Sequence, residues 1–200
     1  DMLEAGVHSL NRRKTVSKEA TKWVITYTGK EVNLDCLRPE DFDIEDVAHA
    51  LSLTCRFGGH SKEFYSVAQH SCYCADLAPN HGKLKALLHD AHEAYVTDVP
   101  WPFKEYITGI EETQDEIDEV MLPKWGVTAG KPIWLKTLDI RVGLAEAKHL
   151  MPPDTYKDFI AYKDGYRPAD ILLENEGCWQ PGLAEDIFLK IFEDQYDASV

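Results

Sequence analysis

The segment from Lys83 to Lys104, KLKALLHDAHEAYVTDVPWPFK, constrains the fold of this chain more than any other stretch. Its apolar residues recur at the spacing of one helix face, which predicts an α-helix from Lys83 to Val96. A polar helix face usually meets solvent. Two ionisable residues elsewhere in the chain indicate a different role for this polar face, which carries His89, Asp90 and Glu93.

These two residues lie on the apolar faces of other predicted helices. Asp139 lies on the core stripe of a helix predicted from Pro132 to Leu150, where an unpaired carboxylate would be costly to bury. His70 lies on the buried side of a helix predicted from Tyr65 to Ala78. Together with the His-Asp pair, these residues offer two imidazoles and two carboxylates, a suitable set for one divalent metal ion. The predicted ligands are His70, His89, Asp90 and Asp139.

Helices are predicted for most of the remaining chain. The runs WVITYT and EVNLDC, separated by Gly29-Lys30, predict one β-hairpin, and no βαβ alternation follows. The chain is therefore expected to be all-α: residues 1–22 form a flexible arm, and residues 23–200 form a single compact helical domain with a minor N-terminal hairpin. Further helices are expected at residues 44–57, 110–122, 154–163 and 183–195.

Composition excludes several classes of function. The formal net charge of -14 disfavours nucleic acid as a partner, although a metal ion and a few arginines can still hold a nucleotide. No apolar run approaches the length of a membrane span and no leader precedes the first motif, so a cytoplasmic protein without membrane contact is expected. The five cysteines lack the spacing of a disulfide framework or of a zinc-thiolate site.

The order of the four predicted ligands resembles that of the HD superfamily of metal-dependent phosphohydrolases. The likeness extends to RFGGHSKEFYSVAQHS at Arg56 to Ser71 and to ALLHDAHEAYVTDVPWPFK at Ala86 to Lys104. These segments look like those of bacterial 5′-deoxynucleotidases and phage deoxynucleoside triphosphohydrolases. The resemblance covers roughly Thr26 to Leu150. It implies an HD-domain helical bundle that hydrolyses phosphate from deoxynucleotides.

Three further residues are candidates for the chemistry. Glu93 follows Asp90 by three residues, which places it beside the metal as a general acid or base. The resemblance implies that Asp98 helps to activate the attacking water. Arg56 matches a phosphate-binding arginine of the family, and its planar fork suits that task.

The resemblance also implies how substrate is recognised. Phe57 matches an aromatic residue that packs against the sugar and leaves no room for a 2′-hydroxyl, so deoxynucleotides are expected. The RFGGHS segment favours a triphosphohydrolase, with deoxyadenosine nucleotides as candidate substrates, over a 5′-deoxynucleotidase for monophosphates. The expected substrate contacts are Arg56, Phe57, Pro102, Lys104 and His60.

The ligand set favours Co²⁺, Mn²⁺, Zn²⁺, Ni²⁺ or Fe²⁺ over Mg²⁺, while a second ion, Mg²⁺, could accompany a polyphosphate. Three other classes compete with this interpretation. An alarmone hydrolase is disfavoured because those enzymes resemble one another in a Glu-Asp pair, whereas Glu93 is followed by Ala94, and a cyclic nucleotide phosphodiesterase is disfavoured because its richer histidine array is missing at the matched positions. The third is a non-catalytic sensor of metal and nucleotide. The joint presence of Glu93, Asp98 and Arg56 disfavours the sensor. A homo-oligomer is expected because Trp125, Trp134 and Trp179 are predicted to be exposed.

Overall fold

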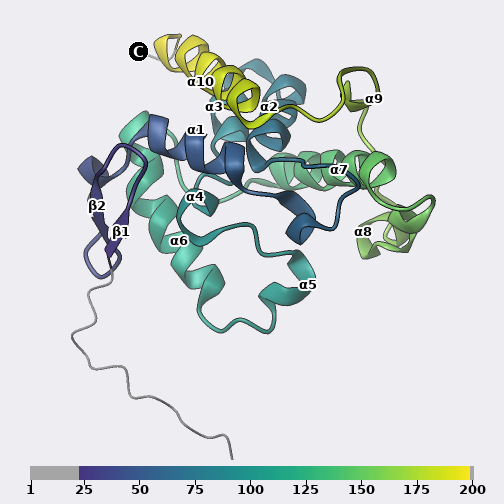
Figure 1. The fold of residues 1–200 in the computed structure, drawn as a ribbon, viewed down its shortest axis with the longest axis horizontal. Helices are drawn as coiled ribbons and strands as arrows, with labels where there is room; N and C mark the ends of the chain where they lie inside the picture. Colours follow the sequence, from purple (N-terminus) through teal and green to yellow (C-terminus); the bar gives the residue numbers. More distant parts are fainter. Residues whose placement is uncertain (1–22, 199–200) are drawn as a thin grey trace, which may run out of the picture.

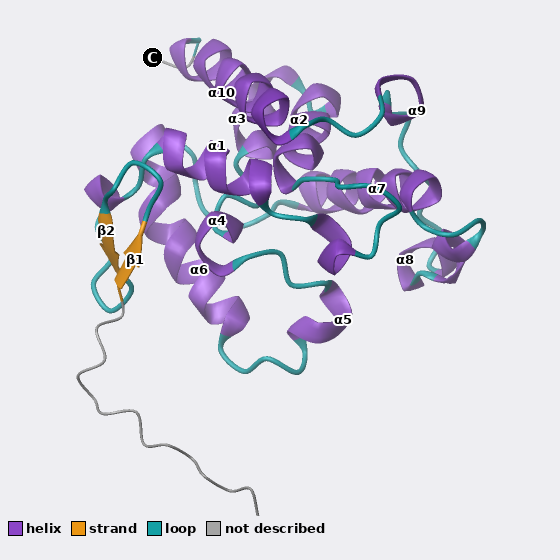
Figure 2. Ribbon diagram, viewed as in Figure 1, coloured by secondary structure: helices purple, strands orange, loops and turns teal. Residues whose placement is uncertain are grey.

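The computed structural model describes residues 23–198 of the chain. Helices dominate this part (Figures 1 and 2), which confirms the prediction of an all-α fold. The predicted arm over residues 1–22 lies outside the described residues. The α-helices of the described part are α1 (Ile44–Leu53), α2 (Val67–Leu77), α3 (Lys83–Leu87), α4 (Glu93–Val96), α5 (Trp101–Lys104), α6 (Ile110–Met121), α7 (Ile133–Leu150), α8 (Ile160–Lys163), α9 (Leu173–Glu176) and α10 (Pro181–Asp197). Short 3₁₀ helices lie at Pro39–Asp41, Arg56–Gly59, Asn80–Gly82, Leu122–Trp125 and Thr155–Asp158.

The predicted hairpin is present. Strands β1 (Trp23–Ile25) and β2 (Glu31–Asn33) pair antiparallel. Gly29 has φ +85° in the turn between them, a conformation that glycine adopts without steric cost. Asp46 of α1 accepts hydrogen bonds from the backbone amide and the hydroxyl of Thr28, at 2.7 and 2.9 Å. The hairpin is therefore tied to the first helix.

Helix α2 is the central element of the bundle. All residues from Val67 to Ala75 are buried, and α10 packs across α1, α2 and α3 (Figure 1). One apolar core includes Leu51 and Phe188, and a second core includes Tyr65 and Leu135. A helix that is covered on all sides places its polar residues in the interior as well, so they need partners there.

The predicted continuous helix from Lys83 to Val96 is wrong, because the chain forms α3 and α4 with an irregular turn over residues 88–92. In this turn the backbone bonds tighten to three-residue spacing: the amide of Ala91 donates to Leu88 O at 3.1 Å, and that of Glu93 donates to Asp90 O at 3.0 Å. The side chains of His89, Asp90 and Glu93 are buried, as their predicted role in a metal site requires.

Helix α1 ends at Leu53, four residues before its predicted end. The reason is a competing backbone pairing: the amide of Val67 donates to Thr54 O at 3.0 Å, and the amide of Arg56 donates to Tyr65 O at 2.9 Å. These bonds hold Thr54 and Cys55 extended against the start of α2. Residues 56–59 then form a separate turn that is described with the site below.

The other predicted helices are present with small changes in their bounds, except that residues 154–163 form two short helices because Phe159 is extended between them. Helices α5 and α9 were not predicted. The tryptophans proposed as exposed are packed instead: Trp125 is buried, and Trp134 and Trp179 are half-buried against the two cores. Self-association therefore stays a prediction, and exposed tryptophans no longer support it. None of the described helices has the length and apolar character needed to cross a membrane.

Candidate metal centre

The four predicted metal ligands converge from three parts of the fold. His70 comes from the middle of α2, His89 and Asp90 from the turn between α3 and α4, and Asp139 from α7. Their candidate ligand atoms all lie within 4.8 Å of one another. The two Nε2 atoms of the histidines are 3.4 Å apart. The carboxylate oxygens lie 3.0 to 3.8 Å from these nitrogens.

These separations fit a single divalent ion. Metal–ligand bonds of about 2.0–2.2 Å place neighbouring ligand atoms about 3.0–3.5 Å apart, which matches most of the observed distances. Cys74, whose Sγ lies 3.6 Å from His70 Nε2, forms a second group with the two histidines only. The nitrogen and oxygen donors of the predicted set therefore provide the more complete site.

Both imidazoles are oriented through their other ring nitrogen. His70 Nδ1 lies 2.6 Å from Glu146 Oε1, and His89 Nδ1 lies 2.7 Å from the carbonyl oxygen of Ala86. A carboxylate and a carbonyl accept hydrogen bonds, so each Nδ1 carries a proton and each Nε2 is the ring nitrogen left to face an ion. The two Nε2 atoms are thus prepared as ligands before any ion binds.

The two carboxylates are held by Lys131, which sequence analysis missed. Its Nζ lies 2.6 Å from Asp90 Oδ1 and 3.8 Å from Asp139 Oδ2, the oxygens opposite those that face the histidines. Burial alone would raise the pKa of Asp90, but the charges of His89 and Lys131 outweigh it and hold that pKa well below its usual range. Burial would also raise the pKa of Asp139, but hydrogen bonds from His70 and His89 outweigh this effect and hold that pKa well below its usual value. Both groups are therefore ionised at neutral pH.

Glu93 is the first residue of α4 and lies beside this set. It is 4 % exposed, and its Oε2 has no hydrogen-bond partner among the described residues. Burial, with added repulsion from Asp90 and Asp98, raises the pKa of Glu93 well above its usual value. Burial also raises the pKa of Asp98, against the opposing charge of Arg56. A buried carboxyl group with a raised pKa is suited to general acid catalysis.

The backbone is strained just before Asp98. Thr97 has φ 65° and ψ 163°, a conformation that is essentially restricted to glycine. Its amide donates the last backbone hydrogen bond of α4, to Glu93 O at 2.9 Å, and the helix ends at this residue. Strain of this kind persists only where the surrounding structure enforces it, and it is concentrated at functional sites. This observation supports the candidacy of Asp98.

Arg56 lies on the opposite side of Asp90 from Lys131. Its Nη1 is 3.8 Å from Asp90 Oδ2 and its Nε is 3.1 Å from Glu146 Oε2, and its side chain is 13 % exposed. Coulombic attraction to Glu146 and other nearby carboxylates outweighs the effect of burial and raises the pKa of Arg56. The arginine is therefore a permanent cation next to the metal ligands.

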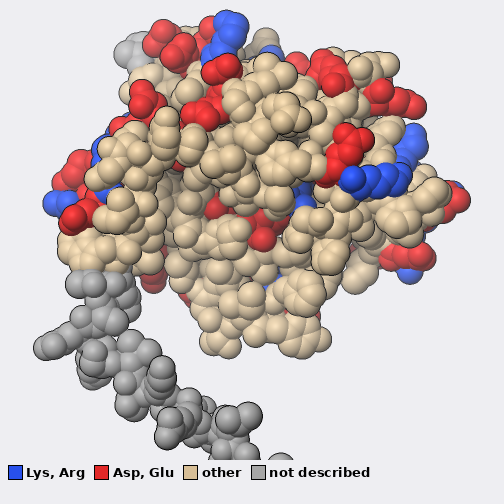
Figure 3. Space-filling model, viewed as in Figure 1, with Lys and Arg blue, Asp and Glu red and all other residues tan. Residues whose placement is uncertain are grey.

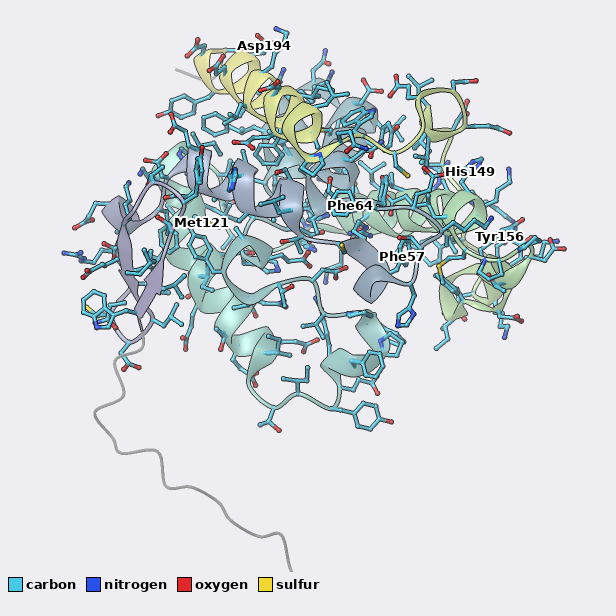
Figure 4. The ribbon with its side chains drawn as sticks, in the orientation of Figure 1. Phe57, Phe64, Met121, His149, Tyr156 and Asp194 are labelled. Atoms are coloured by element: carbon cyan, nitrogen blue, oxygen red, sulfur yellow. The ribbon has the colours of Figure 1, made fainter. Side chains whose placement is uncertain are left out.

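Phe57 follows Arg56 and has φ 56° and ψ 25°, the left-handed region that bulky residues seldom adopt. Figure 4 shows Phe57 in the Arg56–Gly59 turn, between α5 and α7 in that view. The ring is half-buried, with the Arg56 guanidinium 5.7 Å from its centroid. A Cβ added at Gly58 would lie 3.5 Å from the Pro100 side chain, so this turn packs against the segment that leads into α5.

The remaining predicted contacts are less closely tied to the centre. Lys104 Nζ lies 3.3 Å from Gln114 Oε1, and its charge acts on Glu93 and Asp98. Pro102 in α5 and His60 at the end of the Arg56–Gly59 turn are exposed. Charged side chains reach the surface near the middle of the face shown in Figure 3, surrounded mainly by uncharged residues.

His92 lies at the end of the turn between α3 and α4, directly before Glu93. It is buried, and its Nδ1 lies 3.1 Å from both carboxylate oxygens of Asp118 in α6. Asp90, His92 and Glu93 also form a group that could hold a metal ion, but this group shares Asp90 with the main site. The contacts of His49 are with other residues: its ring pairs with Glu185 at 3.0 Å and stacks on the ring of Tyr27.

Sequence reasoning also missed Glu146. A signal for it existed: Glu146 lies two helical turns after Asp139, on the same face of α7 and within a stripe of buried residues. For Lys131 no such signal existed, because it precedes α7 in a loop and its neighbours are unremarkable in pattern.

No family model matches the chain. The chain is 33% identical over 172 residues to a protein named Uncharacterized protein YfdR from Escherichia coli (strain K12), and the match covers 86% of this chain and 94% of that protein. A second relative, Uncharacterized protein RCAP_rcc00048 from Rhodobacter capsulatus, is 33% identical over 124 residues, which are 57% of this chain and 63% of that protein.

Proposed function

This chain belongs to the same family as the Escherichia coli protein YfdR, and we propose that it is a divalent-metal-dependent phosphohydrolase of deoxynucleotides. The proposed substrates are deoxynucleoside triphosphates, with deoxyadenosine triphosphate (dATP) preferred. One observation supports the proposal most: two imidazoles and two carboxylates converge on one point beside a buried carboxyl group and a guanidinium. Hydrolysis of a phosphate ester needs a cation, a proton donor and a phosphate-binding group together.

The ion itself would be held by the four residues at the centre, His70, His89, Asp90 and Asp139. Because two of them are imidazoles, Co²⁺, Mn²⁺, Zn²⁺, Ni²⁺ and Fe²⁺ suit the set better than Mg²⁺, which prefers oxygen ligands. Such an ion supplies Lewis-acid polarisation of the phosphoryl group when bound. A second ion, Mg²⁺, would travel with the polyphosphate chain of the substrate.

The protein side chains divide the remaining tasks. Arg56, held through Nε by Glu146, offers its other guanidinium nitrogens to the phosphoryl oxygens. Glu93 retains its proton through its raised pKa and donates it to the leaving oxygen. Asp98 accepts a proton from the attacking water. Lys104 binds a further phosphate of the chain.

The experiment that tests this proposal compares dATP, ATP and dAMP in the presence of Mn²⁺, Co²⁺, Zn²⁺ or Mg²⁺. We expect dATP to be hydrolysed fastest, ATP more slowly, and no turnover after chelation. The released products are to be identified by chromatography. Full activity of a chelated sample would contradict the metal requirement, and phosphate release from dAMP alone would establish a 5′-deoxynucleotidase instead. Tight binding of metal and nucleotide without turnover of any substrate would indicate a sensor.

The preference for a deoxyribose is expected to depend on Phe57. An apolar ring offers a 2′-hydroxyl no hydrogen-bond partner, which costs a ribonucleotide about 1–3 kcal/mol. Phe57→Gly should therefore raise the relative kcat/KM for ATP over dATP by about 5- to 150-fold. Glycine also fits the left-handed backbone at this position, which offsets part of the packing lost with the half-buried ring.

The matched control is Phe57→Trp, which retains an aromatic ring and should retain the discrimination. Equal turnover of ATP and dATP by the wild type would refute the assignment to Phe57. Loss of thermal stability in Phe57→Gly without any change in discrimination would show that the ring only packs the fold.

A further inference from the structure

One buried carboxylate contacts both halves of the site. Glu146 of α7 is fully buried and uses both of its oxygens. Its Oε1 accepts hydrogen bonds from His70 Nδ1 at 2.6 Å and from the hydroxyl of Tyr65 at 2.8 Å, while its Oε2 accepts from Arg56 Nε at 3.1 Å. The two oxygens thus serve different partners: a predicted metal ligand on one side and the predicted phosphate-binding cation on the other.

We propose that Glu146 is a positioning residue that sets the metal ligand His70 and the phosphate-binding Arg56 in one fixed relation; this inference rests on the proposed function. For His70, the carboxylate fixes the proton on Nδ1 and the direction of Nε2. For Arg56, the bond through Nε leaves the two terminal nitrogens for a phosphate. Displacement of this single carboxylate would therefore disturb both groups together.

Glu146 also limits how closely Arg56 approaches the predicted metal ligands. The next acidic atom along the guanidinium is Asp90 Oδ2, at 3.8 Å, and this oxygen faces the histidines. An arginine that lost Glu146 would pair with Asp90, because a buried cation requires a counter-charge. That pairing would compete with the metal ion for the same oxygen. The expected consequence is weaker metal binding in addition to weaker phosphate binding.

The variant Glu146→Gln tests this inference because it preserves volume and changes the hydrogen-bond pattern. A glutamine offers one oxygen and one NH₂ group, so whichever way it turns, a donor faces either Arg56 or His70. We expect affinity for Co²⁺, measured against a chromogenic chelator, to fall by about 10- to 100-fold. The visible spectrum of the bound Co²⁺ should change as well. Affinity of the Co²⁺-loaded protein for inorganic phosphate, measured by calorimetry, should fall with it.

Tyr65→Phe is the matched control, since it removes one donor to Glu146 and leaves the bonds to His70 and Arg56 in place. It should bind Co²⁺ and phosphate as the wild type does. Circular dichroism and thermal melting of the chelated variants establish that they are folded. If Glu146→Gln does not fold, Glu146→Asp provides the same test, with a shorter side chain that cannot hold both partners.

The outcome that overturns the inference is a folded Glu146 variant with the Co²⁺ affinity, Co²⁺ spectrum and phosphate affinity of the wild type. An equal loss of Co²⁺ and phosphate affinity in Tyr65→Phe would also overturn the inference, because the effect would then follow from general disturbance of the core. None of these measurements requires turnover. A wild type that hydrolyses no nucleotide, with a Glu146→Gln that still loses Co²⁺ and phosphate, would refute the proposed function and leave the positioning assignment intact.

Discussion

Asp139→Ala is expected to abolish binding of the divalent ion and, with it, all metal-dependent turnover. Asp139 Oδ1 lies 3.2 Å from His70 Nε2 and 3.8 Å from His89 Nε2, so it closes the ligand set on the α7 side. Its removal deletes one coordination position and one negative charge, while Lys131 would remain beside Asp90 as a competing cation. The remaining ligands would be the imidazoles of His70 and His89 and the carboxylate of Asp90, whose charge Lys131 partly neutralises.

The measurement is the metal content of the dialysed protein, together with Co²⁺ titration. Lys136→Ala is the matched control, because Lys136 is exposed, lies one turn before Asp139 in α7, and forms no ion pair with the described residues of the centre. It should retain one ion per chain. A dialysed Asp139→Ala protein that keeps its ion at wild-type affinity would contradict the assignment of Asp139 as a ligand.

The four residues of the candidate metal cluster could be identified from the sequence because burial of a charge is costly. Asp139 and His70 stood on faces that were otherwise apolar, and such residues require partners in the folded state. The structure supplies those partners from distant segments: the side chains of His70, His89, Asp90 and Asp139 meet although 69 positions separate the first from the last. The all-α class and the hairpin followed from periodicity in the same way.

Periodicity failed where tertiary contacts outweighed it. The apolar spacing of residues 83–96 describes a continuous helix, but it contains no information about the tight turn at residues 88–92. That turn carries His89 and Asp90, and Glu93 follows it as the first residue of α4, so a segment that is not a continuous helix presents all three. The positive φ of Phe57 and of Thr97 was equally invisible, since neither residue type favours that conformation.

The residues that hydrogen-bond to the predicted ligands, Lys131 and Glu146, could not be predicted from the sequence either. Lys131 becomes a partner of Asp90 only because the loop before α7 crosses the turn after α3, at a separation of 41 residues. Glu146 lies 76 residues from His70 and 90 from Arg56. Spacing along one helix can suggest that such a residue is buried, but the identity of its partners depends on how helices pack.

Glu93→Gln is expected to retain the metal ion and to lower kcat by about 10²- to 10⁴-fold, the usual contribution of a general acid or base. Glutamine has the shape of the wild-type side chain but carries no acidic proton. KM should change little, because the assigned phosphate contacts lie on Arg56 and Lys104. This pattern would separate Glu93 from Asp139, whose loss is expected to remove the ion itself.

Stability provides a second, independent readout for Glu93. The wild-type side chain is 4 % exposed with Oε2 unpartnered, so the folded protein bears the cost of burying an incompletely bonded acidic group beside Asp90 and Asp98. A neutral amide removes the repulsion, and the chelated Glu93→Gln protein should melt at the same temperature as the wild type or higher, as is common when a functional residue is replaced.

Gln114→Ala, another buried polar change in the neighbouring helix α6, serves as the control and should lower stability without a loss of kcat of this size. Loss of the ion in Glu93→Gln would instead identify Glu93 as a ligand, and unchanged kcat would remove it from the chemistry.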